Sequence, residues 1–350
     1  MKTFVVTHCV WNSYGSMLQT LGLKKALLKL GCKSSLLYEM RQPEFKLKLP
    51  RTIKQAVYFP KNLFNKKRFL AQREKGLSFI SDNIDIIYFD DYGELCKNNP
   101  EADLYIAGSD QIWIPNLERP MFFLDFVDGS KKRKASYAAS IGVKSIPDDK
   151  TEKFKEWLKD FSFISVREQQ AKKCISPLTD KEVGVHVDPT FLMTAEEWRS
   201  YETPYPVKQQ YILLYSIYWN KANNEKLREL SRQTGLPVYA VKPAPSRSYC
   251  TKALYDVGPR EFLWLIDNAE YVVTSSFHGA AFSAIFNKRV SLVINPATPS
   301  RLEELSNRFG VPITEIDKLS SAPETDYNTV NKRIEAGRTE AFEYLKTVIK

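Results

Sequence analysis

A histidine stands where a strand is expected to pass into a helix, in residues 275–279, Ser-Ser-Phe-His-Gly. The apolar, β-branched run 271–274 before it is typical of a buried strand, and the small residues after Gly279 favour a helix. Such a turn directs backbone N–H groups and the positive end of a helix dipole at one point, where an anion can bind. His278 could also transfer a proton there near neutral pH. The competing interpretation is a core histidine in an ordinary α/β turn.

Polar side chains follow two other expected strands. Residues 108–111, Gly-Ser-Asp-Gln, come after the strand 103–107, and the glycine lets a ligand approach the backbone closely. Arg167 ends another strand, where a guanidinium group suits a carboxylate or a phosphate. Each signal has a structural alternative, because residues 108–111 would also suit a capped helix start and Arg167 could pair with Glu168 at the surface.

These residues are positioned by strands and helices that alternate along the whole chain. The expected helices are 17–30, one starting at Arg167, 220–234, 259–268, one after Gly279, 300–309 and about 327–346. The expected strands are 4–9, 33–38, 84–89, 103–107, 134–139 and 161–166, then 211–216, 238–241, 271–274 and 290–294.

This alternation predicts an α/β fold of two Rossmann-like, doubly wound domains with parallel sheets. The run Thr-Pro-Tyr-Pro at 203–206 suggests the boundary between them. We therefore expect an N-terminal domain at 1–204, a C-terminal domain with the His278 turn at 205–325 and a C-terminal helix at 326–350. Ligands bind beyond the carboxyl ends of strands in such sheets, so the polar segments should line one cleft.

Composition narrows the classes of function. The chain has 350 residues, 43% of them hydrophobic, and no apolar stretch long enough to cross a bilayer, so we expect a cytoplasmic protein. Its five cysteines and three histidines show no metal-ligand spacing, so we expect neither a metal nor another cofactor.

The segment 41–75 is strongly basic, with eleven Lys and Arg residues against two Glu, a local balance of +9. Aromatic residues are interleaved with these charges. No nucleic-acid-binding motif accompanies the segment, so nucleic acid is not an expected partner. Peripheral contact with anionic lipid head groups or with a phosphorylated carrier fits it better, and a solvated linker and helix face is the default interpretation.

Taken together, the polar segments resemble the polysaccharide pyruvyl transferase family. The resemblance runs from about residue 7 to about 310, and the Gly-Ser-Asp-Gln and Ser-Phe-His-Gly elements are its most specific parts. A departure lies at 311–313, Val-Pro-Ile, where the family often has a basic residue. In chain order the motifs are 12–16 (Asn-Ser-Tyr-Gly-Ser), 108–113 (Gly-Ser-Asp-Gln-Ile-Trp), 137–142 (Tyr-Ala-Ala-Ser-Ile-Gly), 165–168 (Ser-Val-Arg-Glu), 187–192 (Val-Asp-Pro-Thr-Phe-Leu) and 276–279 (Ser-Phe-His-Gly).

The resemblance implies a fold like the two-domain GT-B glycosyltransferases. It also implies an enzyme that takes pyruvate from phosphoenolpyruvate, as co-substrate, and fixes it as a cyclic ketal on two hydroxyls of a sugar. The acceptor would be a surface glycan or its lipid-linked precursor, with the acceptor on the N-terminal and the donor on the C-terminal domain. His278 is implied as catalytic or donor-binding and Arg167 as a ligand for the donor's anionic groups. The other residues expected to bind donor or substrate are Asn12, Tyr14, Gly15, Ser109, Gln111, Asp188, Ser276, Gly279 and Arg301.

The chemistry of this reaction requires one acid and one base near the operating pH. His278 is the candidate acid, for the donor's methylene carbon or for the departing phosphate, and Asp110 or Asp188 is the candidate base. Asp188 precedes Pro189 and would equally well form a turn. Two other functions remain open: a nucleotide-sugar glycosyltransferase on the same fold, and a catalytically silent glycan-binding relative.

Overall fold

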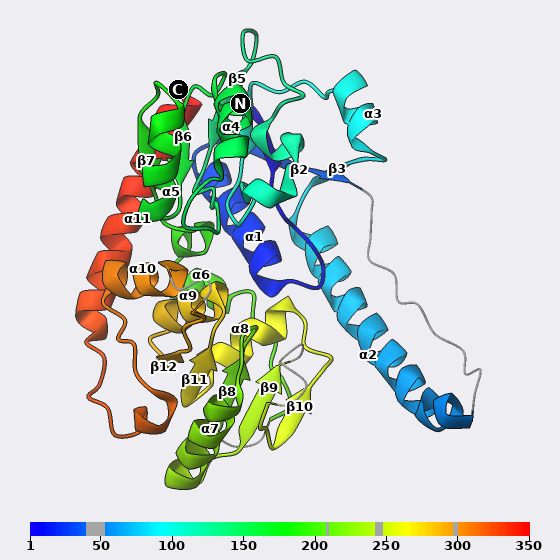
Figure 1. The fold of residues 1–350 in the computed structure, drawn as a ribbon, viewed down its shortest axis with the longest axis vertical. Helices are drawn as coiled ribbons and strands as arrows, with labels where there is room; N and C mark the ends of the chain where they lie inside the picture. The colour runs from blue at the N-terminus through cyan, green and yellow to red at the C-terminus, as the bar shows by residue number, and fades with distance from the viewer. Residues whose placement is uncertain (40–52, 208–209, 242–247, 297–299) are drawn as a thin grey trace.

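The computed structural model describes residues 1–39, 53–207, 210–241, 248–296 and 300–350 (Figure 1). The side chains of residues 53–66 and 300 also fall outside this description. Of the basic segment 41–75, residues 41–52 therefore lie outside the described part of the chain. The remainder belongs to α2 (Ile53–Asn83), so the expected linker is in large part a helix.

The N-terminal half forms a five-stranded sheet in the order β3-β2-β1-β4-β5, with every pair parallel. A two-stranded parallel sheet, β6-β7, continues from β5 through the bridge between Ala135 and Phe163. The strands are β1 (Lys2–Val6), β2 (Lys33–Glu39), β3 (Ile86–Phe89), β4 (Leu104–Ala107), β5 (Arg133–Ser136), β6 (Ile164–Val166) and β7 (Val183–Val185). The strand expected at 4–9 thus ends at Val6, and the polar loop that follows it is longer than expected.

The C-terminal half repeats this topology in a second parallel sheet, β10-β9-β8-β11-β12. In each sheet the first strand of the half pairs with the second and the fourth, which leaves a crevice where the strand order reverses. The strands are β8 (Ile212–Tyr215), β9 (Val238–Val241), β10 (Lys252–Leu254), β11 (Tyr271–Thr274) and β12 (Arg289–Leu292).

Helices connect the strands and pack on both sheets. No helix in the described part of the chain has an apolar stretch long enough to span a bilayer. The other helices are α1 (Tyr14–Lys29), α3 (Tyr92–Lys97), α4 (Asp148–Leu158), α5 (Gln169–Ile175), α6 (Ala195–Arg199), α7 (Lys221–Thr234), α8 (Pro259–Asp267), α9 (Phe277–Ile285), α10 (Ser300–Phe309) and α11 (Tyr327–Ile349).

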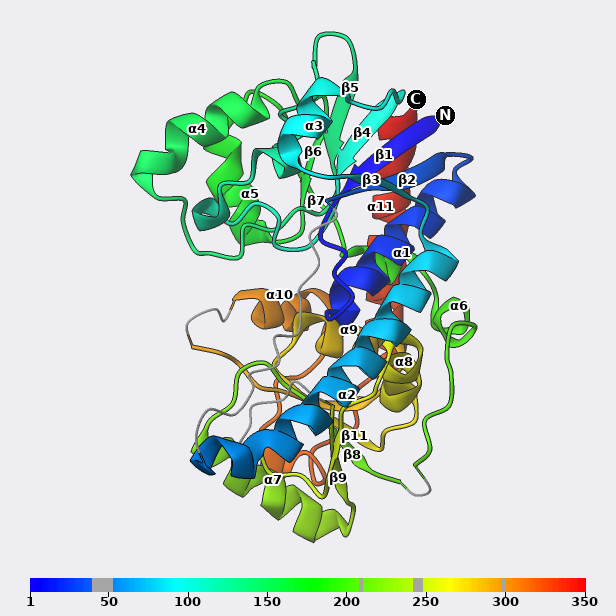
Figure 2. The same cartoon turned by 90° about the vertical axis from the view of Figure 1, so that its right-hand side faces the viewer.

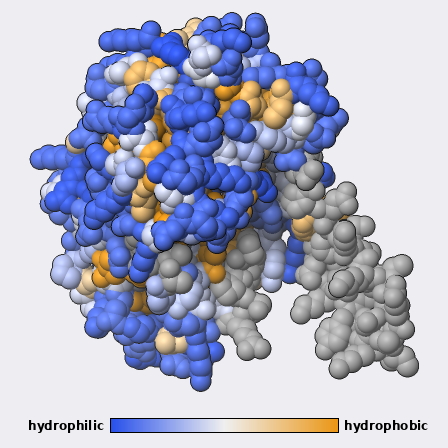
Figure 3. All heavy atoms as spheres, turned by 45° about the horizontal axis from the view of Figure 1, so that its top comes forward, coloured by the Kyte–Doolittle hydropathy of each residue, from blue (hydrophilic) through white to orange (hydrophobic). Residues whose placement is uncertain are grey.

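Two long helices join the halves (Figures 1 and 2). The last helix, α11, leaves the C-terminal half and runs back along the N-terminal sheet, where the Tyr344 hydroxyl donates to the Ser136 carbonyl at 2.8 Å. On another side, α2 leaves the N-terminal sheet and packs on α8. One buried apolar cluster accordingly contains residues of both halves, from Val5 to Val348. On the face shown in Figure 3, hydrophilic side chains predominate and apolar ones form small, separate patches.

Candidate active site

The predicted turn between β11 and α9 brings backbone donors to the edge of the C-terminal sheet. Ser276 caps α9 and accepts the Gly279 N–H at 3.4 Å, while the Thr274 hydroxyl accepts the Ser276 N–H at 3.0 Å. The helix begins at Phe277, three residues earlier than expected, so His278 lies within the first helical turn. Its backbone N–H, like that of Phe277, is at the positive end of the helix dipole.

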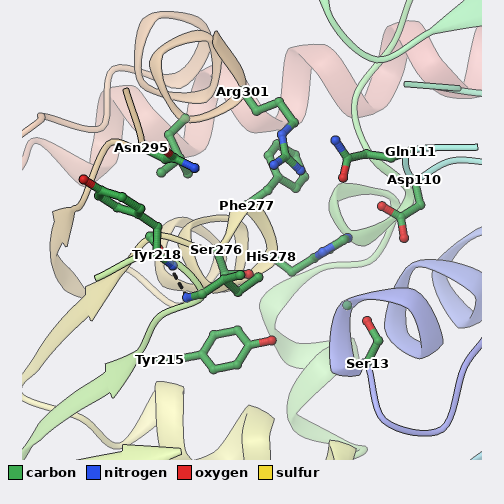
Figure 4. Close-up of a pocket in the computed structure, with 14 residues that line it drawn as sticks. Ser13, Asp110, Gln111, Tyr215, Tyr218, Ser276, Phe277, His278, Asn295 and Arg301 are labelled. Atoms are coloured by element: carbon green, nitrogen blue, oxygen red, sulfur yellow. Dashed lines mark hydrogen bonds between the residues drawn. The ribbon is translucent and has the colours of Figure 1, made fainter. Parts of the chain in front are cut away.

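A cavity of about 220 Å³ lies in front of this turn, between the two halves (Figure 4). Its walls come from the loops that follow β1, β4, β8, β11 and β12 and from the start of α10, as expected for a ligand site at the carboxyl ends of parallel strands. The lining residues are Ser13, Gly15, Asp110, Gln111, Tyr215, Ile217, Tyr218, Ser275, Ser276, Phe277, His278, Asn295, Arg301 and Leu302.

His278 is nearly buried, and its ring lies against the first turn of α1. A Cβ atom placed on Gly15 would stand 2.0 Å from Nδ1 and 2.3 Å from Cγ of the ring, so only glycine leaves room for it there. Burial lowers the pKa of His278, and the nearby Asp188 and Asp110 carboxylates oppose this effect. The imidazole is therefore neutral at pH 7.

Behind the cavity, Arg167 and Asp188 form a buried ion pair, with 2.9 Å between Nη1 and Oδ2. Burial disfavours the charged guanidinium, but the Glu168 and Asp188 carboxylates outweigh it and raise the pKa of Arg167. Burial likewise disfavours ionised Asp188, yet His278 and Arg167 together hold its pKa below the usual value. Both side chains are therefore charged.

Both oxygens of the Asp188 carboxylate accept hydrogen bonds. Oδ1 accepts the backbone N–H and the hydroxyl of Thr190, at 3.0 and 2.9 Å. Oδ2 accepts the Ser109 hydroxyl at 3.0 Å and lies 3.8 Å from Nε2 of His278. Asp188 therefore both forms the turn with Pro189 and holds Arg167 and His278 at the rear of the cavity.

Three buried nitrogens around Phe277 have no hydrogen-bond partner: Nη2 of Arg167, Nε of Arg301 and Nε2 of His278. The Arg167 guanidinium lies over the Phe277 ring, 4.2 Å from its centroid. Burial and the charge of Arg167 lower the pKa of Arg301. Two arginines that repel each other, both with an unmet N–H, are the arrangement expected where an anion binds.

Asp110 faces His278 from the N-terminal half, together with Gln111 (Figure 4). Its φ of 74° places it in the left-handed region, which costs free energy for a residue with a side chain. The strain is held by neighbours, since its carbonyl accepts the N–H groups of Ile112 at 2.8 Å and Ser140 at 3.0 Å. A strained carboxylate at a cavity wall is typical of a functional position.

The structure sorts the residues predicted from the sequence into three groups. Asp110, Gln111, Gly15, Ser276, His278 and Arg301 line the cavity. Arg167, Asp188, Ser109 and Gly279 are packed directly behind it and do not line it.

The third group is Asn12 and Tyr14, which lie away from the cavity. Asn12 is exposed, whereas Tyr14 is buried between the halves. The Tyr14 hydroxyl donates to the Val257 carbonyl at 3.0 Å, and its ring stacks on Phe262. Tyr14 therefore joins α1 to the C-terminal half.

Sequence reasoning did not single out Tyr215, Tyr218 and Asn295, which also line the cavity. Burial raises the pKa of Tyr215 to about 12, so its hydroxyl is a neutral donor. The sequence signal that could have found them is their position at or just after the ends of β8 and β12. The carboxyl ends of all strands in a parallel sheet meet the same crevice.

Comparisons with known proteins show the family and agree with the fold. The sequence profile of the family described as polysaccharide pyruvyl transferase matches residues 14–295, most of the chain and all of the cavity-lining residues except Ser13, Arg301 and Leu302. The chain belongs to this family. No curated protein matches it.

Solved structures show the same fold at low sequence identity. The UDP-GlcNAc 2-epimerase from Neisseria meningitidis is similar with a TM-score of 0.55 and 12% identity, covering 99% of both chains. UGT89C1 of Arabidopsis thaliana, solved with quercetin, has a TM-score of 0.53 and 9% identity, covering 99% of this chain and 98% of that one. The UDP-GlcNAc 2-epimerase from Methanocaldococcus jannaschii has a TM-score of 0.51 and 14% identity, covering 96% of this chain and 92% of that one. The predicted fold class, two Rossmann-like domains in a GT-B arrangement, is thus confirmed.

Proposed function

We propose that this pyruvyl transferase family member moves pyruvate from phosphoenolpyruvate onto two hydroxyls of a sugar as a cyclic ketal. The observation that carries the proposal is that two residues lining the cavity, Arg301 and His278, each have a buried nitrogen without a partner, at a cavity that also meets a helix N-terminus. A third such nitrogen, on Arg167, lies directly behind them. A donor with one phosphate and one carboxylate would supply the acceptors that these nitrogens lack. It would also offset the repulsion between the two arginines.

The proposed steps use the cavity residues as one acid and one base. The donor's methylene carbon takes a proton, for which we propose protonated His278 as the source, and the first sugar hydroxyl adds to the adjacent carbon. The second hydroxyl then displaces the phosphate, which leaves as inorganic phosphate, and the ketal closes. We assign Asp110 as the base for the hydroxyls, because it lines the cavity opposite His278.

Asp188 fits a positioning role better than that of a base. Both of its oxygens already accept hydrogen bonds, and it does not line the cavity. Gly15 likewise positions His278 by leaving space for the ring. No cofactor enters these steps. In the described part of the chain, no group of three or more His, Cys, Asp or Glu side chains is arranged to hold a metal ion.

We further propose that the protein acts in the cytoplasm on a glycan or a lipid-linked sugar, with the basic segment 41–75 touching an anionic membrane surface. Two of its described cations are engaged elsewhere. The Arg68 guanidinium lies over the Tyr255 ring at 3.7 Å, and Lys75 pairs with Glu261 at 2.6 Å. In this proposal the other basic residues of the segment 41–75 would contact the lipid. Neutralising Lys66 and Lys67 should lower binding to vesicles with anionic lipid, and unchanged binding would refute this contact.

Phosphate release tests the reaction. His278→Ala should lose release of phosphate from phosphoenolpyruvate with glycan acceptors, because it removes the proposed acid. Ser283→Ala is the matched control: this buried side chain of α9 donates to the Gly279 carbonyl at 2.8 Å and does not line the cavity. Wild-type turnover in His278→Ala would refute the assignment.

Ligand-dependent melting separates the other candidate functions. Phosphoenolpyruvate should raise the melting temperature of the protein, as expected for a ligand of the folded state. A rise with nucleotide sugars instead would indicate a glycosyltransferase. Stabilisation by glycans alone, without any release of phosphate, would indicate a catalytically silent binding protein.

A further inference from the structure

A second cavity, of about 240 Å³, adjoins the candidate active site at the carboxyl ends of β8 and β12. Tyr218 lines both cavities. The residues after β12 alternate between them, since Asn295 lines the first cavity and Ile294 and Pro296 line the second. The two cavities therefore share a wall, and one extended ligand could occupy both.

A side-chain amide in the first turn of α7 borders the second cavity and has a hydrogen-bond donor without an acceptor. Nδ2 of Asn223 is buried and has no hydrogen-bond partner. The backbone N–H of the same residue is already accepted by the Asn220 side chain at 2.9 Å, so the amide group is not needed for capping. Ser291 donates its hydroxyl to the Thr314 carbonyl at 2.6 Å and keeps its lone pairs for a ligand.

The charges in this cavity are paired. Lys226 makes an ion pair with Glu315 and lies 3.7 Å from Asp317. Glu315 also accepts from Lys318 at 2.8 Å, and these two lysines hold the pKa of Glu315 down at about 2. Because the cation that lines the cavity is already neutralised, the site does not favour a phosphate. It suits a neutral ligand with many hydroxyls.

Apolar groups complete the lining. Ile313 borders the cavity with 50% of its surface exposed, and the Tyr218 side chain stands at the shared wall. Side-chain amides beside apolar surface match the hydroxyl edge and the C–H face of a pyranose ring.

We propose that the second cavity is a saccharide subsite, which holds the sugar unit next to the one that receives pyruvate. Because its lining comes from the C-terminal half, the acceptor would extend beyond the N-terminal domain expected to bind it. The inference rests on the proposed function, because it takes the first cavity as the place of transfer. It narrows the acceptor class to glycans of at least two units, whose linkage passes Tyr218.

Binding of defined saccharides to the full-length protein tests this subsite. The probes are methyl glycosides of glucose, galactose, mannose and N-acetylglucosamine and the di- and trisaccharides built from them, measured by titration calorimetry. At least one disaccharide should bind about tenfold more tightly than its monosaccharide. Asn223→Leu should remove this gain, since a lost hydrogen bond to a ligand weakens binding about tenfold. Asn328→Leu makes the same change at an exposed position in the first turn of α11 and should have no effect.

Each outcome decides between the proposals. Equal affinity for mono- and disaccharides, or an unchanged gain in Asn223→Leu, would overturn the subsite. So would binding of UDP that depends on Asn223, which would make the cavity a nucleotide site. Melting shifts with phosphoenolpyruvate are measured separately, so a missing saccharide preference leaves the proposed reaction standing. Conversely, a saccharide preference without phosphate release would support the subsite and refute the reaction.

Discussion

Gly15→Ala should inactivate the enzyme because the added methyl group would displace the His278 ring. The new methyl group would stand 2.0 Å from Nδ1 of His278, whereas ordinary contacts begin at 3.4 Å, so the ring or the helix must move by about 1.4 Å (3.4 − 2.0). A displacement of about 1 Å at a reacting group costs about 100-fold in rate. We therefore expect phosphate release to fall about 100-fold or more.

The effect on folding should be small by comparison. Alanine at this helical position gains about 0.5–1 kcal/mol over glycine, and the added methyl group in a packed site costs about 1–3 kcal/mol. The free energy of unfolding should therefore fall by no more than about 2.5 kcal/mol. Loss of activity would then come from a folded protein.

Gly93→Ala is the matched control, because Gly93 also occupies the second position of its helix, α3. A Cβ atom there meets only Asp91 Oδ1, at 3.1 Å. Phosphate release and the ring signals of the three histidines in NMR spectra report function and ring position. Wild-type release in Gly15→Ala, together with a shifted His278 signal, would refute the idea that the ring position sets the rate.

Three other measurements test buried charges, two at the site and one at Glu202. Asp188→Asn should lower the free energy of unfolding by up to about 3 kcal/mol in a denaturant titration, because it removes one of the two carboxylates that pair with buried Arg167 and leaves only Glu168. Burial and Asp267 raise the pKa of half-buried Glu202 to about 7, above its value of 4.5 in the unfolded chain. The free energy of unfolding should therefore fall as the pH rises from 4.5 to 7. Glu202→Gln should recover about 1 kcal/mol of it at pH 8, after allowance for solvent screening. The imidazole of His278 should titrate below 6.5 without ligand and higher with phosphoenolpyruvate, followed by NMR.

The sequence allowed ten of the twelve strands in the described part of the chain to be predicted, because buried parallel strands are short β-branched runs between helical patterns. The three-residue strands β7 and β10 were not expected. The strands 238–241 and 271–274 and the helix 300–309 have the expected bounds. The long helix α2 was not expected. Its sequence is rich in charge and contains Pro60, which disfavours a helix interior, and its described contacts are with α1 and with the distant α8 of the C-terminal half.

The site was predicted less completely than the fold. His278 and Arg301 were found because histidine and arginine at strand or helix ends carry chemistry. The contact of the His278 ring with Gly15 joins residues 263 positions apart (278 − 15), and no local pattern reveals it. Tyr14 has the motif position of a ligand-binding residue, yet its hydroxyl is used by the Val257 carbonyl. Motifs locate the loops, whereas packing decides which side chain of each loop faces the ligand.

The charges of the site imply that the proposed acid forms only when the donor binds. His278 is neutral because burial and two arginines lower its pKa, more than Asp188 and Asp110 raise it. A bound trianion would neutralise the charge of the arginines and add negative charge beside the ring. Both effects would raise the pKa of His278. Proton uptake would then accompany binding. The residues that hold the donor in this proposal therefore also determine when His278 can act as an acid.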